Sequence, residues 1–316
     1  MTFAIAILGA RGRLGHCVTK AALDAGHRVI AVTRDGRLPT DLADAEPRAA
    51  NALDRQSLIA ATEGADVVIN ALNPLYTDWA EMCMPMAENV IAACKANRAA
   101  HLFAGNIYNF GRFLPPLLDP ETPEKPETRK GVIRIEIERL FRDAVTRDGV
   151  NTTVLRAGDF YGGTGSGSWF DLMIAAKLEK GKFVWPGRGD IPHAWAYLPD
   201  LGRAFVKVAE QLGELDGFNS FTFEGHTLSG NEMQALAELA VGHNLMRSSV
   251  PWIVLRAAGF VVPMLREVCE MSYLWFTPHA LDGTRLETFI GTLDSTPPEQ
   301  AMAEAIRDLP KSRKAA

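Results

Sequence analysis

The sequence has few cysteines, and none of them is spaced to bind a metal. Cys17, Cys83, Cys94 and Cys269 include no C-x-x-C pair and no Cys/His ligand spacing. The seven histidines form no H-x-x-x-H pattern and the carboxylates form no ligand cluster, so no metal site is predicted. No secretory signal precedes the first apolar strand, which together with the cysteine pattern predicts a reduced, cytoplasmic protein.

Basic runs and long apolar runs are absent as well. A net charge of −5 and scattered arginines exclude an extended nucleic-acid surface. The one segment that suggests a membrane, residues 250–265, is too short for a span and is interrupted by Arg256 and two prolines. We predict a buried helix there rather than an amphipathic membrane-surface helix, because its polar face has too little Lys and Arg. No membrane partner is expected.

A strand, a glycine-rich turn and a helix open the chain. Apolar residues 3–8 lead into Gly9-Ala-Arg-Gly12-Arg-Leu-Gly15, a helix follows, and residues 27–33 read as the next strand. Glycines at this spacing allow a tight turn and bring backbone N–H groups close to a pyrophosphate. The pattern predicts a dinucleotide site rather than an empty structural turn. Its predicted cofactor contacts are Gly9, Arg11, Gly12, Arg13, Leu14 and Gly15.

Helices and strands continue to alternate after this unit. Helices at 57–64, 79–97 and 130–147 are predicted between strands at 65–71, 101–105 and 150–156, an order typical of a parallel sheet. The predicted fold is α/β, a Rossmann-type doubly wound parallel sheet with a smaller, mainly helical C-terminal substrate region. Residues 1–160 form the cofactor domain, with sheet and helix returns near 190–225, and residues 161–316 are mainly substrate-binding. Asp200 and Ser229 are the expected N-caps of helices 201–211 and 232–241.

Four further motifs lie at expected strand ends: Asp66-Val-Val-Ile-Asn-Ala71, Gly105-Asn-Ile-Tyr-Asn-Phe-Gly111, Val154-Leu-Arg-Ala-Gly-Asp-Phe-Tyr-Gly162 and Trp195-Ala-Tyr-Leu-Pro-Asp200. With the glycine loop, they make the chain resemble the extended and atypical short-chain dehydrogenase/reductases over at least residues 3–225. The family's catalytic Tyr and Lys are missing. Their positions fall on Lys130 and Arg134, and the Ser position falls on Gly105-Asn106.

Residues 130–138 are similar to a helix of the atypical branch, which includes isoflavone reductases, phenylcoumaran benzylic ether reductases and NmrA-like proteins. In those reductases the lysine is the acid/base group, so the resemblance implies that role, and a cofactor contact, for Lys130. Burial can lower the pKa of a lysine enough for proton exchange near neutral pH. The alternative is an exposed first-turn residue beside Arg129.

The end of the second strand bears on the choice of nicotinamide. An arginine there accommodates the 2′-phosphate of NADP, whereas an acid binds the 2′-hydroxyl of NAD. Arg34, with Arg11, favours NADP, and Asp35 is the counter-signal for NAD. Asn51 is either an adenine contact or a turn residue. The remaining predicted cofactor contacts lie at the carboxyl edge of the sheet: Asn70, Ala71, Leu72, Gly105 and Asn106.

Candidate substrate residues follow from position and chemistry. Tyr108 is the phenol nearest the missing catalytic position, and is either a proton donor or a packed aromatic. His193 lies in a loop expected to face the site, as a catalyst or as a structural histidine. The predicted substrate contacts are Tyr161, Trp169, His193 and Trp195, although large aromatics more often belong to a core.

Three functions fit these residues. The favoured one is an NADP-dependent reductase acting on a small apolar or aromatic carbonyl, enone or benzylic substrate, with Lys130 or Tyr108 managing the proton. The alternatives are a nucleotide-sugar epimerase or dehydratase, and a non-catalytic NADP-binding sensor of the NmrA-like kind. The resemblance also implies a homodimer through helices 79–97 and 130–147.

Overall fold

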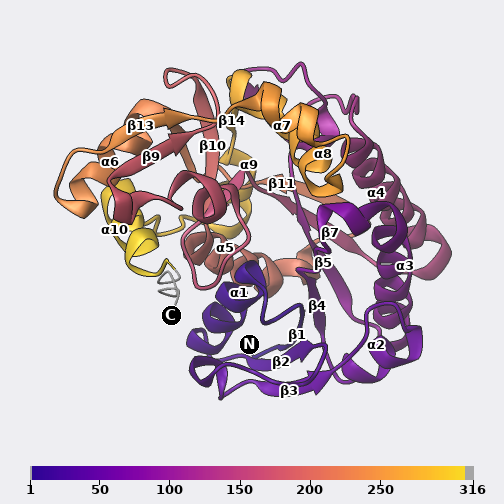
Figure 1. Ribbon diagram of the computed structural model, residues 1–316. Helices are drawn as coiled ribbons and strands as arrows, with labels where there is room; N and C mark the ends of the chain where they lie inside the picture. The colour runs from indigo at the N-terminus through magenta and orange to yellow at the C-terminus, as the bar shows by residue number, and fades with distance from the viewer. Residues whose placement is uncertain (1, 310–316) are drawn as a thin grey trace.

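The computed structural model describes residues 2–309, so residue 1 and residues 310–316, the outer ends of the two predicted regions, lie outside the described part. A seven-stranded parallel sheet forms its centre, in the order β11-β7-β5-β4-β1-β2-β3 (Figure 1). This confirms the predicted Rossmann-type sheet. Its strands are β1 (Ala4–Leu8), β2 (Arg28–Thr33), β3 (Glu46–Ala49), β4 (Val67–Asn70), β5 (Ala100–Gly105), β7 (Thr152–Arg156) and β11 (Phe218–Thr222).

Helices cover both faces of the sheet. Figure 1 shows α1 and α5 on one face and α2, α3 and α4 on the other. Each face has its own apolar core, because each helix turns its regularly spaced apolar residues toward the strands. The sheet is therefore doubly wound. The bounds are α1 (Arg13–Asp24), α2 (Arg55–Ala61), α3 (Trp79–Asn97), α4 (Arg129–Asp148), α5 (Leu198–Gln211) and α9 (Thr284–Ile290).

The C-terminal region combines helices with short strands. A three-stranded sheet has the order β12-β10-β8, β9 pairs with β13, and β6 pairs with β14. Ser229 is the N-cap of α6 as predicted, and it forms a reciprocal capping box with Glu232. The bounds are β6 (Leu117–Leu118), β8 (Asp159–Tyr161), β9 (Lys182–Trp185), β10 (Pro192–Tyr197), β12 (His226–Ser229), β13 (Met246–Ser249), β14 (Ala280–Leu281), α6 (Gly230–Val241), α7 (Trp252–Ala258), α8 (Pro263–Glu270) and α10 (Pro298–Arg307).

Two local predictions were wrong. Asp200 does not cap α5, which begins at Leu198 with Tyr197 as its N-cap. The carboxylate of Asp200 instead accepts hydrogen bonds from the backbone N–H and hydroxyl of Thr296, at 2.8 and 2.7 Å. Residues 250–265 do not form one buried helix. They form α7, a break and the start of α8, and several of their apolar side chains are exposed.

The glycine loop depends on a close approach between two backbones. Gly9 has a φ of +79°, and Gly12 N–H donates to Gly9 O at 2.7 Å. A Cβ on Gly15 would lie 2.1 Å from Gly9 O. Since heavy atoms cannot approach so closely, only glycine at position 15 allows α1 to pack against the end of β1.

Substituting Gly15→Ala is expected to displace the loop and weaken NADPH binding by about tenfold or more, as measured by the fluorescence of bound nicotinamide. Gly213→Ala is the matched control, because a Cβ at position 213 would meet nothing within 4 Å and the φ of Gly213 is ordinary. Equal affinities for NADPH in the two variants would contradict the argument from close packing.

Candidate active site at the carboxyl edge of the sheet

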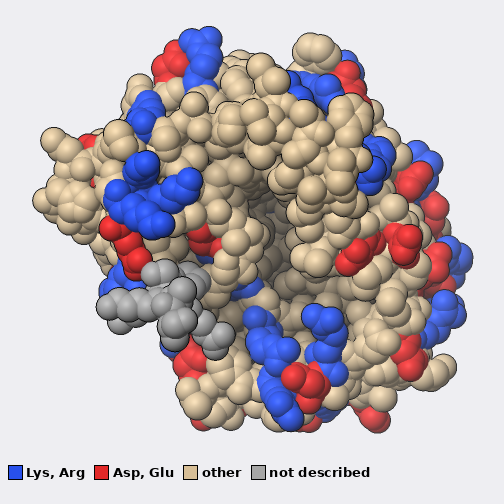
Figure 2. Space-filling view, in the orientation of Figure 1, with Lys and Arg blue, Asp and Glu red and all other residues tan. Residues whose placement is uncertain are grey.

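The predicted cofactor residues gather where neighbouring parallel strands end. The glycine loop follows β1, Arg34 follows β2, Asn70 ends β4 and Gly105 ends β5. These ends lie at one edge, since the strands are parallel. Figure 2 shows a deep hollow in this face of the molecule, with uncharged surface above it and basic side chains on its lower rim.

The first turn of α1 can receive an anion. Gly12 is the N-cap of this 12-residue helix and has no side chain to occupy the free N–H groups. A helix N-terminus with free N–H groups attracts a phosphate through its dipole and its donors. The loop therefore fits the pyrophosphate of a dinucleotide.

Arg13 does not point toward such a ligand. Its guanidinium forms an ion pair with Asp171 at 2.6 Å and donates to the carbonyl of Gly162 at 2.5 Å. Asp171 also accepts a backbone hydrogen bond from Gly167. The Arg13 side chain is thus engaged within the protein, and a cofactor contact of this residue stays a prediction for its backbone N–H. This side chain instead holds the glycine-rich segment 162–167 against the cofactor loop.

The arginines near the end of β2 differ in their partners. Arg11 is paired with Asp35 at 2.9 Å, and both side chains are exposed. This hydrogen bond lowers the pKa of the Asp35 carboxyl. Arg34 is exposed and has no ion pair within residues 2–309. Arg34, like the exposed Arg37, therefore has a cationic side chain outside any ion pair of residues 2–309, while Asp35 is engaged with Arg11.

Three asparagines at this edge shape the backbone. Asn51 accepts from Leu53 N–H at 3.1 Å, Asn70 accepts from Leu72 N–H at 3.2 Å, and Asn106 accepts from Tyr108 N–H at 3.0 Å. Each side chain closes a local turn. Asn51 is therefore a turn residue, and its remaining amide donors are available to a ligand.

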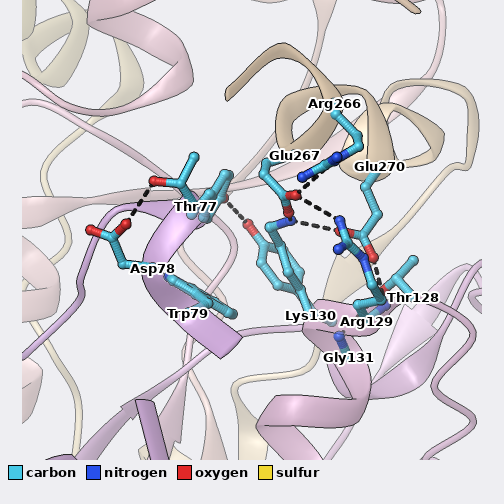
Figure 3. Close-up of polar contacts among 12 residues, drawn as sticks. Thr77, Asp78, Trp79, Thr128, Arg129, Lys130, Gly131, Arg266, Glu267 and Glu270 are labelled. Atoms are coloured by element: carbon cyan, nitrogen blue, oxygen red, sulfur yellow. Dashed lines mark hydrogen bonds and ion pairs between the residues drawn. The ribbon is translucent and has the colours of Figure 1, made fainter. Parts of the chain in front are cut away.

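Lys130 lies at the first turn of α4 and is 1% exposed. Figure 3 shows its side chain extending from α4 to two carboxylates of α8. Its Nζ lies 2.5 Å from Glu267 and 2.6 Å from Glu270, and 4.9 Å from the ring centre of Tyr76. Burial acts to raise the pKa of Glu267, but the hydrogen bonds from Lys130 and Arg129 outweigh it and lower that pKa. The interpretation of Lys130 as an exposed residue is wrong, and its charge is committed to α8.

Arg134, one turn further along α4, is a buried cation that donates to Ala104 O at 3.4 Å and forms no ion pair within residues 2–309. Its guanidinium lies 4.7 Å from the ring centre of Trp79 and 5.2 Å from that of Phe103. Burial lowers its pKa, and its Nε has no hydrogen-bond partner among the described residues. Beside it is a cavity of about 20 Å³ that Asn70 and Leu72 also line. An oxygen of a bound cofactor would satisfy this donor.

The phenol of Tyr108 is paired with that of Tyr76, the two oxygens lying 2.7 Å apart. Tyr108 follows β5 and is buried, whereas Tyr76 follows β4 and is half-buried. Burial raises the pKa of Tyr76 to about 12 and that of Tyr108 further. Sequence reasoning missed Tyr76. Its position six residues after Asn70, at the same sheet edge, was the available signal.

Most of the predicted substrate contacts are core residues. His193 is 1% exposed, stacks on Trp275 at 4.4 Å and is bonded through Nε2 to Asp159 at 2.8 Å. Tyr161 and Trp195 are equally buried. Their predicted contact with substrate is wrong, because their side chains are enclosed by the aromatic core of the C-terminal region. Trp169 remains half-buried at the edge of that core.

The glycine loop, the free helix N-terminus and the sheet edge define a dinucleotide-binding protein. The chain belongs to the NAD(P)H-binding family, whose model matches residues 9–169. It is 24% identical over 263 residues to phenylcoumaran benzylic ether reductase PT1 of Pinus taeda, with 78% of each chain covered. It is also 28% identical over 227 residues to the 3-diazoavenalumate denitrifying reductase of a Streptomyces species, covering 65% of this chain and 72% of the relative.

Solved structures share the whole fold. UDP-glucose 4-epimerase from Brucella ovis in complex with NAD superposes with a TM-score of 0.76 at 16% identity over 97% of both chains. The UDP-glucose 4-epimerase from Bifidobacterium longum in complex with NAD⁺ and UDP gives 0.77 at 15% identity, over 96% of this chain and 97% of the other. The sequence resemblance to extended and atypical short-chain dehydrogenase/reductases is thus confirmed, and binding of NAD(P) follows from the family.

Replacing Lys130 should mainly affect stability. Lys130→Met removes the buried cation that both Glu267 and Glu270 contact and leaves Arg129 as their remaining shared partner. This is expected to lower the free energy of unfolding by about 2–3 kcal/mol, measured by urea denaturation. Lys95→Met is the matched control, since Lys95 forms an exposed ion pair with Asp148 and should change that free energy by less than about 1 kcal/mol. Similar losses in the two variants would show that the α4–α8 tie is not a stabilising contact.

Proposed function

We propose that this protein is an NADPH-dependent reductase in which the Tyr76–Tyr108 pair provides the proton for substrate reduction. The observation that carries the proposal is the hydrogen bond between these two phenols at the edge of the sheet where the family's cofactor loop lies. The pair occupies the neighbourhood of the missing family tyrosine, and Lys130 is held by Glu267 and Glu270.

A bound nicotinamide supplies the hydride. The chain's own part is to hold the proton: Tyr76 Oη, on the half-buried residue of the pair, donates it to the substrate oxygen. Tyr108 Oη–H then donates a hydrogen bond to the phenolate left on Tyr76. A tyrosine phenol is protonated at neutral pH, and desolvation raises the pKa of Tyr76 above its ordinary value, so the proton stays on Tyr76 until a stronger base develops on the substrate.

An apolar or aromatic carbonyl, enone or benzylic compound is the proposed substrate class. Figure 2 shows mostly uncharged surface above the central hollow. Trp169 is half-buried at the edge of the aromatic core and offers a flat apolar contact. The name of a relative, phenylcoumaran benzylic ether reductase, supports the same class.

NADP is the proposed cofactor form, and Arg34 is the residue that would select it. Arg34→Ala is expected to raise the dissociation constant of NADPH by about tenfold, through loss of a charge-assisted contact, and to leave that of NADH unchanged. Fluorescence titration with both nucleotides measures this. Arg139→Ala, an exposed arginine on α4, serves as the control. Equal losses for NADPH and NADH, or no loss, would contradict selection by Arg34.

Removing the phenol hydroxyls tests the proton donor. Tyr76→Phe and Tyr108→Phe are each expected to lower kcat for reduction of an aromatic enone by about 100-fold or more, as general-acid losses do, with NADPH affinity unchanged. Tyr197→Phe is the control, because the Tyr197 hydroxyl is bonded to Glu304 in the C-terminal region. Full activity of Tyr76→Phe would remove this residue from the mechanism.

The same assays separate the two alternative functions. Tightly co-purified NAD with turnover of a nucleotide sugar would identify an epimerase or dehydratase. Binding of NADPH without turnover of any carbonyl, enone or benzylic compound would favour a cofactor-binding sensor.

A further inference from the structure

A carboxylate that the proposed mechanism does not use follows the sheet at the same edge as the phenol pair. β5 and β7 are parallel neighbours, and Gly105 pairs with Arg156 where these strands end. Tyr108 and Asp159 each lie three residues beyond this pair, so both residues follow the same edge of the sheet. Asp159 is half-buried, with 12% of its side chain exposed. It therefore lies at the edge where the proposed substrate would be reduced.

Three phenols lie within electrostatic reach of this carboxylate. Burial raises the pKa of Tyr76, Tyr108 and Tyr273, and the negative charge of Asp159 acts on each of them in the same direction. Tyr273 belongs to the segment 271–276 that follows α8, and its hydroxyl oxygen is buried with no hydrogen-bond partner among residues 2–309. A buried hydroxyl without a partner is costly, which indicates that a group of a ligand completes it.

The next strand of the small sheet and His193 hold the Asp159 side chain in place. β8 begins at Asp159 and pairs in parallel with β10, where Trp195 lies opposite Asp159. His193, two residues before Trp195, donates a hydrogen bond from Nε2 to Asp159 Oδ2 at 2.8 Å. The centre of its imidazole lies 4.4 Å from that of Trp275 and 4.5 Å from that of His279, so the ring has little room to turn. One oxygen of the carboxylate is therefore fixed by the protein.

The other oxygen of this carboxylate is available to a ligand. Asp159 Oδ1 has no hydrogen-bond partner within residues 2–309. A carboxylate oxygen only accepts hydrogen bonds, whereas the phenol of Tyr273 can donate one. A ligand hydroxyl can donate to Asp159 and accept from Tyr273, which satisfies all three groups. A methyl ether has no proton to donate, and an anionic group is repelled by the carboxylate.

We propose that Asp159 and Tyr273 bind a hydroxyl group of the substrate and that His193 positions Asp159 for this contact. The inference rests on the proposed reductase function. It narrows the substrate class to carbonyl, enone or benzylic compounds that also carry a hydroxyl group. Asp159 takes no proton from the substrate in this scheme. It selects the substrate and orients it, while Tyr76 donates the proton to the reacting oxygen.

Matched aromatic enones test the hydroxyl subsite on the full chain. Benzylideneacetones with a ring hydroxyl in the ortho, meta or para position are compared with their methyl ethers, with NADPH as the reductant. The wild type is expected to have a KM about tenfold or more lower for at least one hydroxylated isomer than for its ether, because the ether loses a hydrogen bond to a charged acceptor. In Asp159→Asn the amide can donate to either oxygen, so this preference should fall to about threefold or less, with kcat changed less than about threefold.

Two further positions test the partners of Asp159. Tyr273→Phe removes the donor and should raise the KM for the preferred hydroxylated isomer by about threefold or more. His193→Phe keeps a ring beside Trp275 but cannot donate to Asp159, so it should lower the preference for hydroxyl over ether as well. His193→Gln, which can donate, should restore part of that preference. Equal preferences in the wild type and His193→Phe would remove the positioning role of His193.

Asp190→Asn is the matched control, because Asp190 is an exposed carboxylate paired with Arg188 and should leave the preference unchanged. Urea unfolding curves of all variants check that the fold is kept. Calorimetric titration of the protein saturated with NADP⁺, using the same compounds, measures hydroxyl binding without turnover. A preference for hydroxyl that Asp159→Asn removes, with no enone reduced, would contradict the reductase proposal and support the subsite. Reduction of the enones with no preference for any hydroxylated isomer, or with the full preference kept in Asp159→Asn, would overturn the subsite alone.

Discussion

A buried lysine shared by two carboxylates joins the cofactor-binding half of the molecule to its C-terminal helices. Lys130 belongs to α4, which packs on the sheet, and Glu267 and Glu270 belong to α8. An ion pair removed from water is stable only while all its members stay in place, because each charge is costly to bury alone. The cluster therefore ties α8 to α4 and, through α4, to the sheet.

The same cluster accounts for the unusual composition of the site. A tyrosine at position 130 could not satisfy two carboxylates, so the lysine serves the tie to α8 while phenols from two other strand ends stand nearby. In the proposed mechanism, the proton donor and the structural anchor are thus different residues. In such a site, the partners that surround a side chain indicate its role better than its match to the family pattern does.

Sequence reasoning could predict the elements that local patterns determine. The parallel sheet, the helix at 79–97 and the glycine loop follow from periodicity, and these agree with the structure.

Sequence reasoning could not predict the features that depend on contacts with residues far away in the chain. β3 has a proline and two charged residues, so only pairing along β2 makes it a strand. Arg13 sits within the cofactor motif, yet Asp171, 158 residues away, sets its direction. His193 and Trp195 look like loop residues beside glycine and proline, and only their packing with Trp275 shows that they are core.

Helix α8 links the surface of the molecule to the buried ion-pair cluster. It is eight residues long, about 12 Å at the usual rise per residue, and it begins next to Val262 and ends at Glu270. Near the C-terminal end of α8, the carboxylates of Glu267 and Glu270 form ion pairs with Lys130, whose Nζ lies over the ring of Tyr76. Helix α8, about two turns long, thus connects the exposed segment that ends at Val262 to the ion-pair cluster beside Tyr76.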